Sequence, residues 1–380
     1  MRLKGPLAGT TPTQFAVAAA YAAQGFGYAA IATSLPEFKD HLDLTDTAIS
    51  LILLGLCFGA AAGSVLADAV AVWRGSRQAL VCGFLIQVAA LVVVSTVPSL
   101  LIFLACITVY SIGLGMVDAA SNMQGVLAQA GSEIPLMGRL YAAYTAAAFG
   151  GALAMSGFLA STGTITGAVL LAAAVQGVVA LIGWRRFDHR RAARQAHTHP
   201  DPLPRKPVWI VGLVVLVAFA LDSSVATWSS IYLSDGLDAT KAVAPFGYAA
   251  YQLLVLISRL AADPLVAVAG RPKAALIAIG AGFAGTVVVA LVPTIPAAVA
   301  GFAVAGIGVG ILVPIAFSAA GEILPARSDE IIARVNIFNY VGVVVGAAAL
   351  GLVAGASLGP AFLLPGVILL SAVAVARRLA

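Results

Sequence analysis

Apolar runs of about 20 residues recur along almost the whole chain, and short segments between them hold most of the charges. A helix needs about 20 mostly apolar residues to cross the ~30 Å hydrocarbon core of a membrane. Twelve runs meet this requirement: 13–35, 47–67, 78–97, 99–122, 138–160, 164–184, 208–232, 244–266, 273–293, 296–318, 330–354 and 359–376. We therefore expect an all-α polytopic membrane protein with twelve transmembrane helices.

The composition excludes several other classes of protein. Only 10% of the 380 residues are charged and 61% are apolar, whereas about 25% of the residues in a soluble domain are charged. Cys57, Cys82 and Cys106 lie inside apolar runs, which predicts neither a disulfide framework nor a metal site. The spans contain no histidine and no nucleophile–base arrangement, so we expect no enzyme and no cofactor.

Basic residues gather on one side of the predicted topology. When both termini are placed in the cytoplasm, all of the 21 Lys and Arg residues except Lys39 and Lys241 fall on the cytoplasmic side. This distribution follows the positive-inside rule, and an odd number of spans would divide the basic residues between the two sides of the membrane. The outer loops are acidic and contain Glu37, Asp40, Asp43, Asp46, Asp235 and Asp238. Short basic clusters between spans also argue against binding to nucleic acid.

One long polar segment, 185–207, divides the chain into six spans and six spans. We interpret it as a cytoplasmic linker between two six-helix bundles, 1–184 and 208–380. The halves share a weak repeat, because GSVLAD (63–68) and SRLAAD (258–263) both end in an acid that is soon followed by Arg. Such charges can clamp helix ends and release them, although simple anchors at the membrane surface are the alternative. The candidate gate residues are Asp68, Arg74, Arg259 and Asp263.

Two acids lie deep inside predicted spans. Ionisable groups there are costly and usually face a cavity or a partner. Asp118 belongs to a polar stripe on one helix face, together with Ser111, Asn122 and Gln129. Asp222 lies beside Ser223 and other polar residues that predict a polar surface. We expect Asp118 and Asp222 to couple protons to transport; hydrogen bonds between helices, or pairing of Asp222 with a cationic substrate, are the alternatives.

Amide and aromatic side chains inside the spans suit a polar, uncharged or zwitterionic solute, because rings stack and amides give directional hydrogen bonds. Each of them alone also fits helix packing or an interfacial position. The candidate substrate-binding residues are Gln24, Tyr28, Asn122, Tyr141, Tyr144, Trp228, Tyr248, Gln252, Asn336, Asn339 and Tyr340.

Several motifs resemble the major facilitator superfamily, in particular the YbjJ-like group of bacterial inner-membrane proteins near the fucose-permease branch. GLGMVDAASNMQG (113–125) resembles span 4 of that group, and LDSSVATWSSIYL (221–233) resembles span 7. Segments 136–153, 306–322 and 333–346 are similar to its spans 5, 10 and 11. The sequence departs from the family pattern at Tyr141, where His is usual, and at Thr227 and Gln129, where acids are usual.

The resemblance implies a secondary transporter of the major facilitator fold, in a bacterial cytoplasmic membrane with both termini inside. It implies alternating access around a site between the halves. The leading interpretation is proton-coupled movement of a sugar-like or other small polar metabolite. A proton-driven efflux antiporter for a drug or natural product and an uncoupled facilitator are the alternatives. We expect a monomer, because one chain contains both halves.

Overall fold

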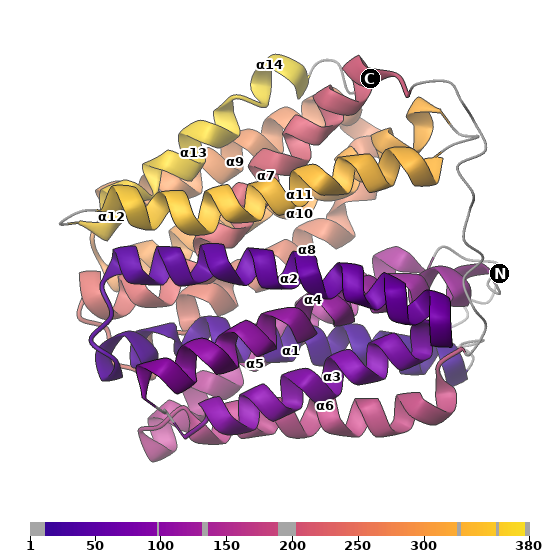
Figure 1. Ribbon diagram of the computed structural model, residues 1–380. Helices are drawn as coiled ribbons and strands as arrows, with labels where there is room; N and C mark the ends of the chain where they lie inside the picture. Colours follow the sequence, from indigo (N-terminus) through magenta and orange to yellow (C-terminus); the bar gives the residue numbers. More distant parts are fainter. Residues whose placement is uncertain are drawn as a thin grey trace, which may run out of the picture. The chain divides into compact units, whose positions relative to one another are not determined.

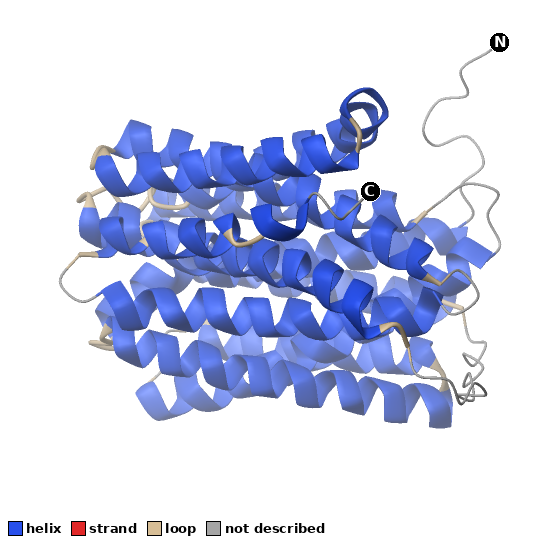
Figure 2. Ribbon diagram, turned by 90° about the horizontal axis from the view of Figure 1, so that it is seen from above, coloured by secondary structure: helices blue, strands red, loops and turns tan. Residues whose placement is uncertain are grey.

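The computed structural model describes residues 12–96, 99–130, 136–188, 203–324, 328–354 and 357–376. These residues form helices joined by short loops, without a strand (Figure 2). The helices, labelled in Figure 1, are α1 (Pro12–His41), α2 (Asp46–Arg74), α3 (Ser76–Val94), α4 (Leu100–Ala130), α5 (Met137–Thr162), α6 (Thr166–Arg186), α7 (Arg205–Ile231), the π-helical turn η1 (Tyr232–Gly236), α8 (Phe246–Ala269), α9 (Arg271–Leu291), α10 (Ile295–Ile323), α11 (Ser328–Ala354), α12 (Leu358–Ala361), α13 (Leu363–Leu370) and α14 (Val373–Ala376).

These helices confirm the prediction of a multi-pass, all-α membrane protein. Eleven helical segments of the described chain are long and apolar enough to span a membrane, and the apolar part of α11, 337–353, is shorter. The last span, 358–376, is broken into α12, α13 and α14. α1 continues to His41, beyond its predicted end at 35, so Lys39 lies on a helix and not in a loop.

Contacts group the described residues into two compact units. Unit 1 contains 12–28, the described part of 58–148, and 166–188, whereas unit 2 contains 29–57, 149–165 and the described residues from 203 onward. The boundaries predicted at 184 and 208 stay a prediction. Both chain ends and 189–202 of the predicted linker lie outside the described residues.

The backbone repeats at an interval of 195 residues, the interval that separates Asp68 from Asp263. Gly75 and Gly270 start α3 and α9 with positive φ angles of 100° and 78°. Asp43 and Asp238 carry φ angles of 51° and 52°, the two positive values found for non-glycine residues in the described chain. Parallel repeats of this kind are typical of transporters built from two similar halves. The repeat therefore extends well beyond the two hexapeptides that reveal it in the sequence.

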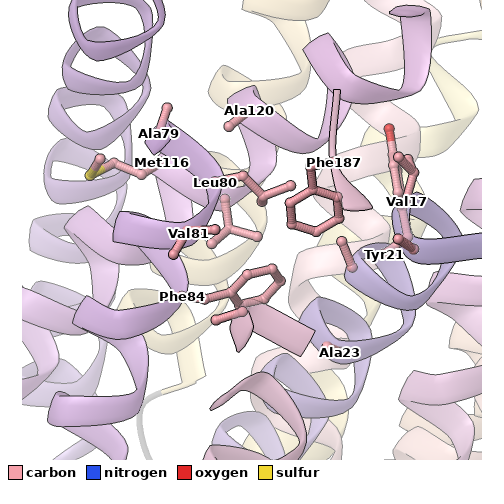
Figure 3. Packing of buried hydrophobic residues seen from close by; sticks show 14 of the residues in the cluster. Val17, Tyr21, Ala23, Ala79, Leu80, Val81, Phe84, Met116, Ala120 and Phe187 are labelled. Atoms are coloured by element: carbon pink, nitrogen blue, oxygen red, sulfur yellow. The ribbon is translucent and has the colours of Figure 1, made fainter. Parts of the chain in front are cut away.

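Close helix packing repeats at the same interval. Gly115 of α4 lies against the carbonyl oxygen of Ala60 on α2, and Gly310 of α10 lies against that of Val255 on α8. Small residues at these positions let the two backbones approach, which is how helices associate within lipid. In unit 1, apolar side chains of α1, α3 and α4 pack with Phe187 into a buried cluster (Figure 3).

A methyl group at Gly115 is expected to destabilise the protein. Its Cβ atom would overlap the Ala60 carbonyl, which belongs to backbone and cannot rotate away. Overpacking of this kind costs about 1–3 kcal/mol. We expect Gly115→Ala to lower the melting temperature of the purified protein by several degrees.

The matched control is Gly157→Ala, because nothing lies within 4 Å of a Cβ atom at that helical position. It should leave the melting temperature unchanged or raise it slightly. Equal melting temperatures for the two variants would contradict the packing described between α2 and α4.

Candidate functional site

Asp118 lies half-buried on α4 and faces α1. The side chain of Gln24, which is 2% exposed, donates a hydrogen bond from Nε2 to Asp118 Oδ1 at 3.0 Å. The same Nε2 lies 3.4 Å from the backbone carbonyl oxygen of Leu114. Polar groups inside a span require partners within the protein, and each of these two side chains supplies one to the other.

Two further glutamines continue from Gln24 in a hydrogen-bonded chain. Gln87 of α3 donates from Nε2 to Gln24 Oε1 at 2.9 Å, and Gln176 of α6 donates from Nε2 to Gln87 Oε1 at 2.9 Å. The side chains of Gln87 and Gln176 are fully buried. Sequence reasoning missed both residues. The available signal was an amide in the apolar middle of each of two spans, since an amide buried there needs a partner.

Asn122, one helical turn beyond Asp118, is bracketed by two phenols. Tyr21 of α1 donates a hydrogen bond to Asn122 Oδ1 at 2.6 Å, and Tyr141 of α5 donates to the same oxygen at 3.0 Å. The two rings meet edge to face with centroids 5.4 Å apart. Tyr141 is 42% exposed, so part of this amide–phenol group is not covered by neighbouring helices.

Other residues predicted near Asp118 have different surroundings. Ser111 bonds to the carbonyl oxygen of Thr108 on its own helix, and Gln129 Oε1 accepts from the backbone N–H groups of 136 and 137 at the start of α5. Tyr28 and Tyr144 are half-buried, and the backbone of Tyr144 packs on Gly25. Of the predicted stripe, Asp118 and Asn122 therefore bond to side chains of other helices in unit 1, whereas Ser111 and Gln129 bond to nearby backbone groups.

A second polar group surrounds Asp222 in unit 2. Tyr251 of α8 donates a hydrogen bond to Asp222 Oδ1 at 2.7 Å, and the charge of Arg259 acts on both residues. The rings of Tyr248 and Tyr251 stack with centroids 6.3 Å apart, and Gln252 donates to the Tyr248 hydroxyl. Arg259, predicted to work at the gate, thus also belongs to the surroundings of Asp222.

The polar residues beside Asp222 hold α7 to α11. Ser223 Oγ donates to the carbonyl oxygen of 343 at 2.7 Å, Ser224 Oγ to that of 346 at 3.0 Å, and Trp228 Nε1 to that of 347 at 2.8 Å. The polar side chains expected to form a surface on α7 therefore mostly contact α11. Trp228 is fully buried, which favours a packing role for it over substrate binding. On α11, Asn339 is half-buried and Tyr340 is exposed. The side chain of Asn336 lies outside the described residues.

Three of the four predicted gate residues lie in the last two turns of their helices: Asp68 and Arg74 in α2, and Asp263 in α8. Asp68 and Arg74 are exposed on α2, and the Arg74 guanidinium lies 4.2 Å from the centroid of the neighbouring Trp73 ring. Asp263 lines a cavity of about 230 Å³ together with Arg271. Arg271 forms an ion pair with Glu322 of α10, a contact that the sequence analysis did not anticipate.

At the opposite helix ends, the two basic residues that depart from the positive-inside pattern are both paired with acids of unit 2. Lys39 Nζ lies 2.7 Å from Asp46 Oδ1 and also pairs with Asp235. Lys241 Nζ lies 2.6 Å from Glu37 Oε1. These ion pairs connect the ends of α1 and α2 to the segment that joins α7 and α8.

Comparisons with known proteins identify the class. A family model described as Major Facilitator Superfamily matches residues 17–295. The chain is 26% identical to an uncharacterized MFS-type transporter of Yersinia pestis over 358 residues, which cover 93% of this chain and 92% of the relative. It is 27% identical to Membrane protein MosC of Rhizobium meliloti over 356 residues, covering 92% and 85%.

Solved structures share the fold. The chain matches a variant of the nucleoside transporter NupG with a TM-score of 0.78 and 14% identity, over 97% of this chain and 99% of that one. It matches the MFS transporter FucP with a TM-score of 0.65 and 15% identity, over 97% and 98%. The chain belongs to the major facilitator superfamily and is a membrane transporter, not an enzyme. The predicted family and fold class are confirmed.

Proposed function

We propose that the protein is a proton-coupled secondary transporter that moves a small polar organic solute by alternating access. The observation that carries the proposal is the setting of Asp118, a half-buried carboxyl group whose hydrogen-bond partner is the neutral amide of Gln24. A carboxyl group held by a neutral donor in a span can gain and lose its charge without breaking an ion pair. Such a group is suited to carrying a proton.

Asp222 differs from Asp118 because a cation acts on it. The positive charge of Arg259 on α8 acts on the Asp222 carboxyl group, which also accepts a hydrogen bond from Tyr251. We therefore assign the transported proton to Asp118 first. Asp222 has the second role, in which its charge changes when solute binding alters its electrostatic interaction with Arg259.

The side chains around the two acids support a polar solute as substrate. Asn122 and Tyr141 offer an amide and an accessible phenol in unit 1, and Gln252 and Tyr248 offer the same chemistry in unit 2. Amides and aromatic rings recognise hydroxyl-bearing or heterocyclic solutes by hydrogen bonding and stacking. We propose a sugar-like or nucleoside-like metabolite as the substrate class.

The charged helix ends support a gate on each side of the membrane. We propose that Asp68, Arg74 and Asp263, with the Arg271–Glu322 pair, act at the cytoplasmic ends, and that the Lys39 and Lys241 pairs act at the outer ends. We further propose a monomer in a bacterial cytoplasmic membrane with both termini inside, because this orientation places nearly all basic residues in the cytoplasm.

A panel of solutes tests the proposed substrate class. The purified protein is heated with nucleosides, hexoses, amino acids or lipophilic cations, and positive solutes are then followed into proteoliposomes. We expect one polar class to raise the melting temperature of the wild type, and to do so less in Asn122→Ala. Gln78→Leu, near the start of α3, is the control. Stabilisation and transport of lipophilic cations alone would favour an efflux antiporter and contradict the proposed substrate.

A further inference from the structure

The three glutamines of unit 1 form a hydrogen-bond chain with a single direction. Gln176 donates to Gln87, Gln87 donates to Gln24, and Gln24 donates to Asp118. The chain thereby links α6, α3, α1 and α4 through buried side chains. Each donor points toward the carboxylate, so every amide dipole in the chain favours the negative charge of Asp118.

The chain ends at an unsatisfied atom. Within the described part of the protein, Gln176 Oε1 is buried without a hydrogen-bond partner, while Gln176 Nε2 also lies 3.5 Å from the carbonyl oxygen of Ala23. A buried polar atom without a partner is costly and calls for an explanation. Gly27 leaves the space for this amide, because a Cβ atom there would overlap Gln176 Nε2.

The unsatisfied oxygen is explained if the chain has a second arrangement. A protonated Asp118 is a hydrogen-bond donor, and Gln24 can accept from it only after turning its Oε1 toward α4. The Gln24 amide then donates to Gln87, Gln87 donates to Gln176, and Gln176 Oε1 gains the partner that it lacks. One polar group of Gln176 stays unpaired in either arrangement. The turn also gives up the contacts of Gln24 Nε2 with the Leu114 carbonyl and of Gln176 Nε2 with the Ala23 carbonyl, so the second arrangement is favoured only when Asp118 carries a proton.

We propose that Gln24, Gln87 and Gln176 form a reversible hydrogen-bond chain that sets the proton affinity of Asp118 and reverses its donors when Asp118 takes up a proton. Gln87 and Gln176 are thus positioning residues. Through them, protonation of Asp118 on α4 changes the orientation of an amide on α6. The transport role of the chain rests on the proposed proton coupling. The chain itself requires only that Asp118 titrates.

The groups that face Asp118 make this interpretation specific. Gln24 faces it from α1. Two phenols, Tyr21 of α1 and Tyr110 of α4, interact electrostatically with Asp118. Phenols are neutral near pH 7. Among the described residues of unit 1, the orientation of the three amides is therefore what can change the proton affinity of Asp118.

Infrared titration of the purified full-length protein tests the chain without any solute. The C=O band of protonated Asp118, identified by its loss in Asp118→Asn, is followed as the pH changes. Gln87→Leu removes the donor that locks Gln24, so the carboxylate loses support and the midpoint should move up by about one pH unit, a tenfold change. Gln176→Leu, one residue further along, should move it in the same direction by less. Gln78→Leu on α3 is the control and should not move it.

Two results would overturn the proposal. One is a midpoint in Gln87→Leu and Gln176→Leu equal to that of the control; the other is a band in the wild type that does not respond to pH. Gln176→Leu alone is sufficient if Gln87→Leu does not fold. Because no solute is involved, a normal graded shift without solute-driven proton movement would refute the proposed transport function and leave the chain intact.

Discussion

Asp118→Asn is expected to abolish uphill accumulation of solute but to leave the exchange of solute across the membrane intact. Asparagine keeps the shape of the side chain and an oxygen that accepts from Gln24, so packing should be preserved, but it cannot carry a proton. A gradient of one pH unit supplies 1.36 kcal/mol per proton, enough for about tenfold accumulation with one proton per solute. We expect about tenfold accumulation in wild-type proteoliposomes and none in the variant.

Asp238→Asn is the control for this experiment, because Asp238 is exposed in the loop before α8 and asparagine tolerates its positive φ angle. It should accumulate solute like the wild type. Exchange of labelled for unlabelled solute should proceed in Asp118→Asn at a rate within a few-fold of the wild type. Undiminished accumulation in Asp118→Asn would exclude this residue as the proton carrier.

Charge reversal at Lys39 is expected to reduce transport about tenfold or more. Lys39 is the cation between Asp46 and Asp235, and its side chain is only 16% exposed. Lys39→Asp would place three carboxylates together, and breaking a partly buried ion pair in this way costs up to about 3–5 kcal/mol. The ends of α1 and α2 would then lose their attachment to η1, so the state seen here would be less populated. Initial rates of solute exchange measure the effect.

A charge exchange separates the ion pair from a general loss of folding. The double variant Lys39→Asp/Asp235→Lys restores an ion pair between positions 39 and 235. It leaves an acid at 39 beside Asp46, so it should recover part of the exchange rate. Lys206→Asp, an exposed change at the start of α7, should have little effect. Failure of the double variant to exceed Lys39→Asp, with both proteins folded, would show that the pair does not control transport.

The sequence was sufficient to predict the helices because a chain in lipid must satisfy its backbone hydrogen bonds within each span. It was also sufficient to single out Gln24, Asp118, Asn122 and Tyr141, since polar groups in apolar helices are few. The structure brings these four together on α1, α4 and α5.

Partners on other helices were harder to predict. Hydropathy defines where a helix lies along the chain but not how it rotates against its neighbours, and rotation is set by packing. The joining of Gln87 to Gln176 depends on the facing sides of α3 and α6. Likewise, Arg259 interacts with Asp222 because of how α8 packs against α7. Trp228 forms its hydrogen bond with α11 because of how α11 packs there.

Solute-driven proton movement is the most direct test of proton-coupled transport. Lightly buffered proteoliposomes containing the wild type, Asp118→Asn or Asp222→Asn receive each solute of the panel while the internal pH is recorded. We predict a pH change with one polar solute class in the wild type and its loss in Asp118→Asn. Transport of that solute with no pH change, and with both variants behaving like the wild type, would contradict proton coupling and identify a facilitator.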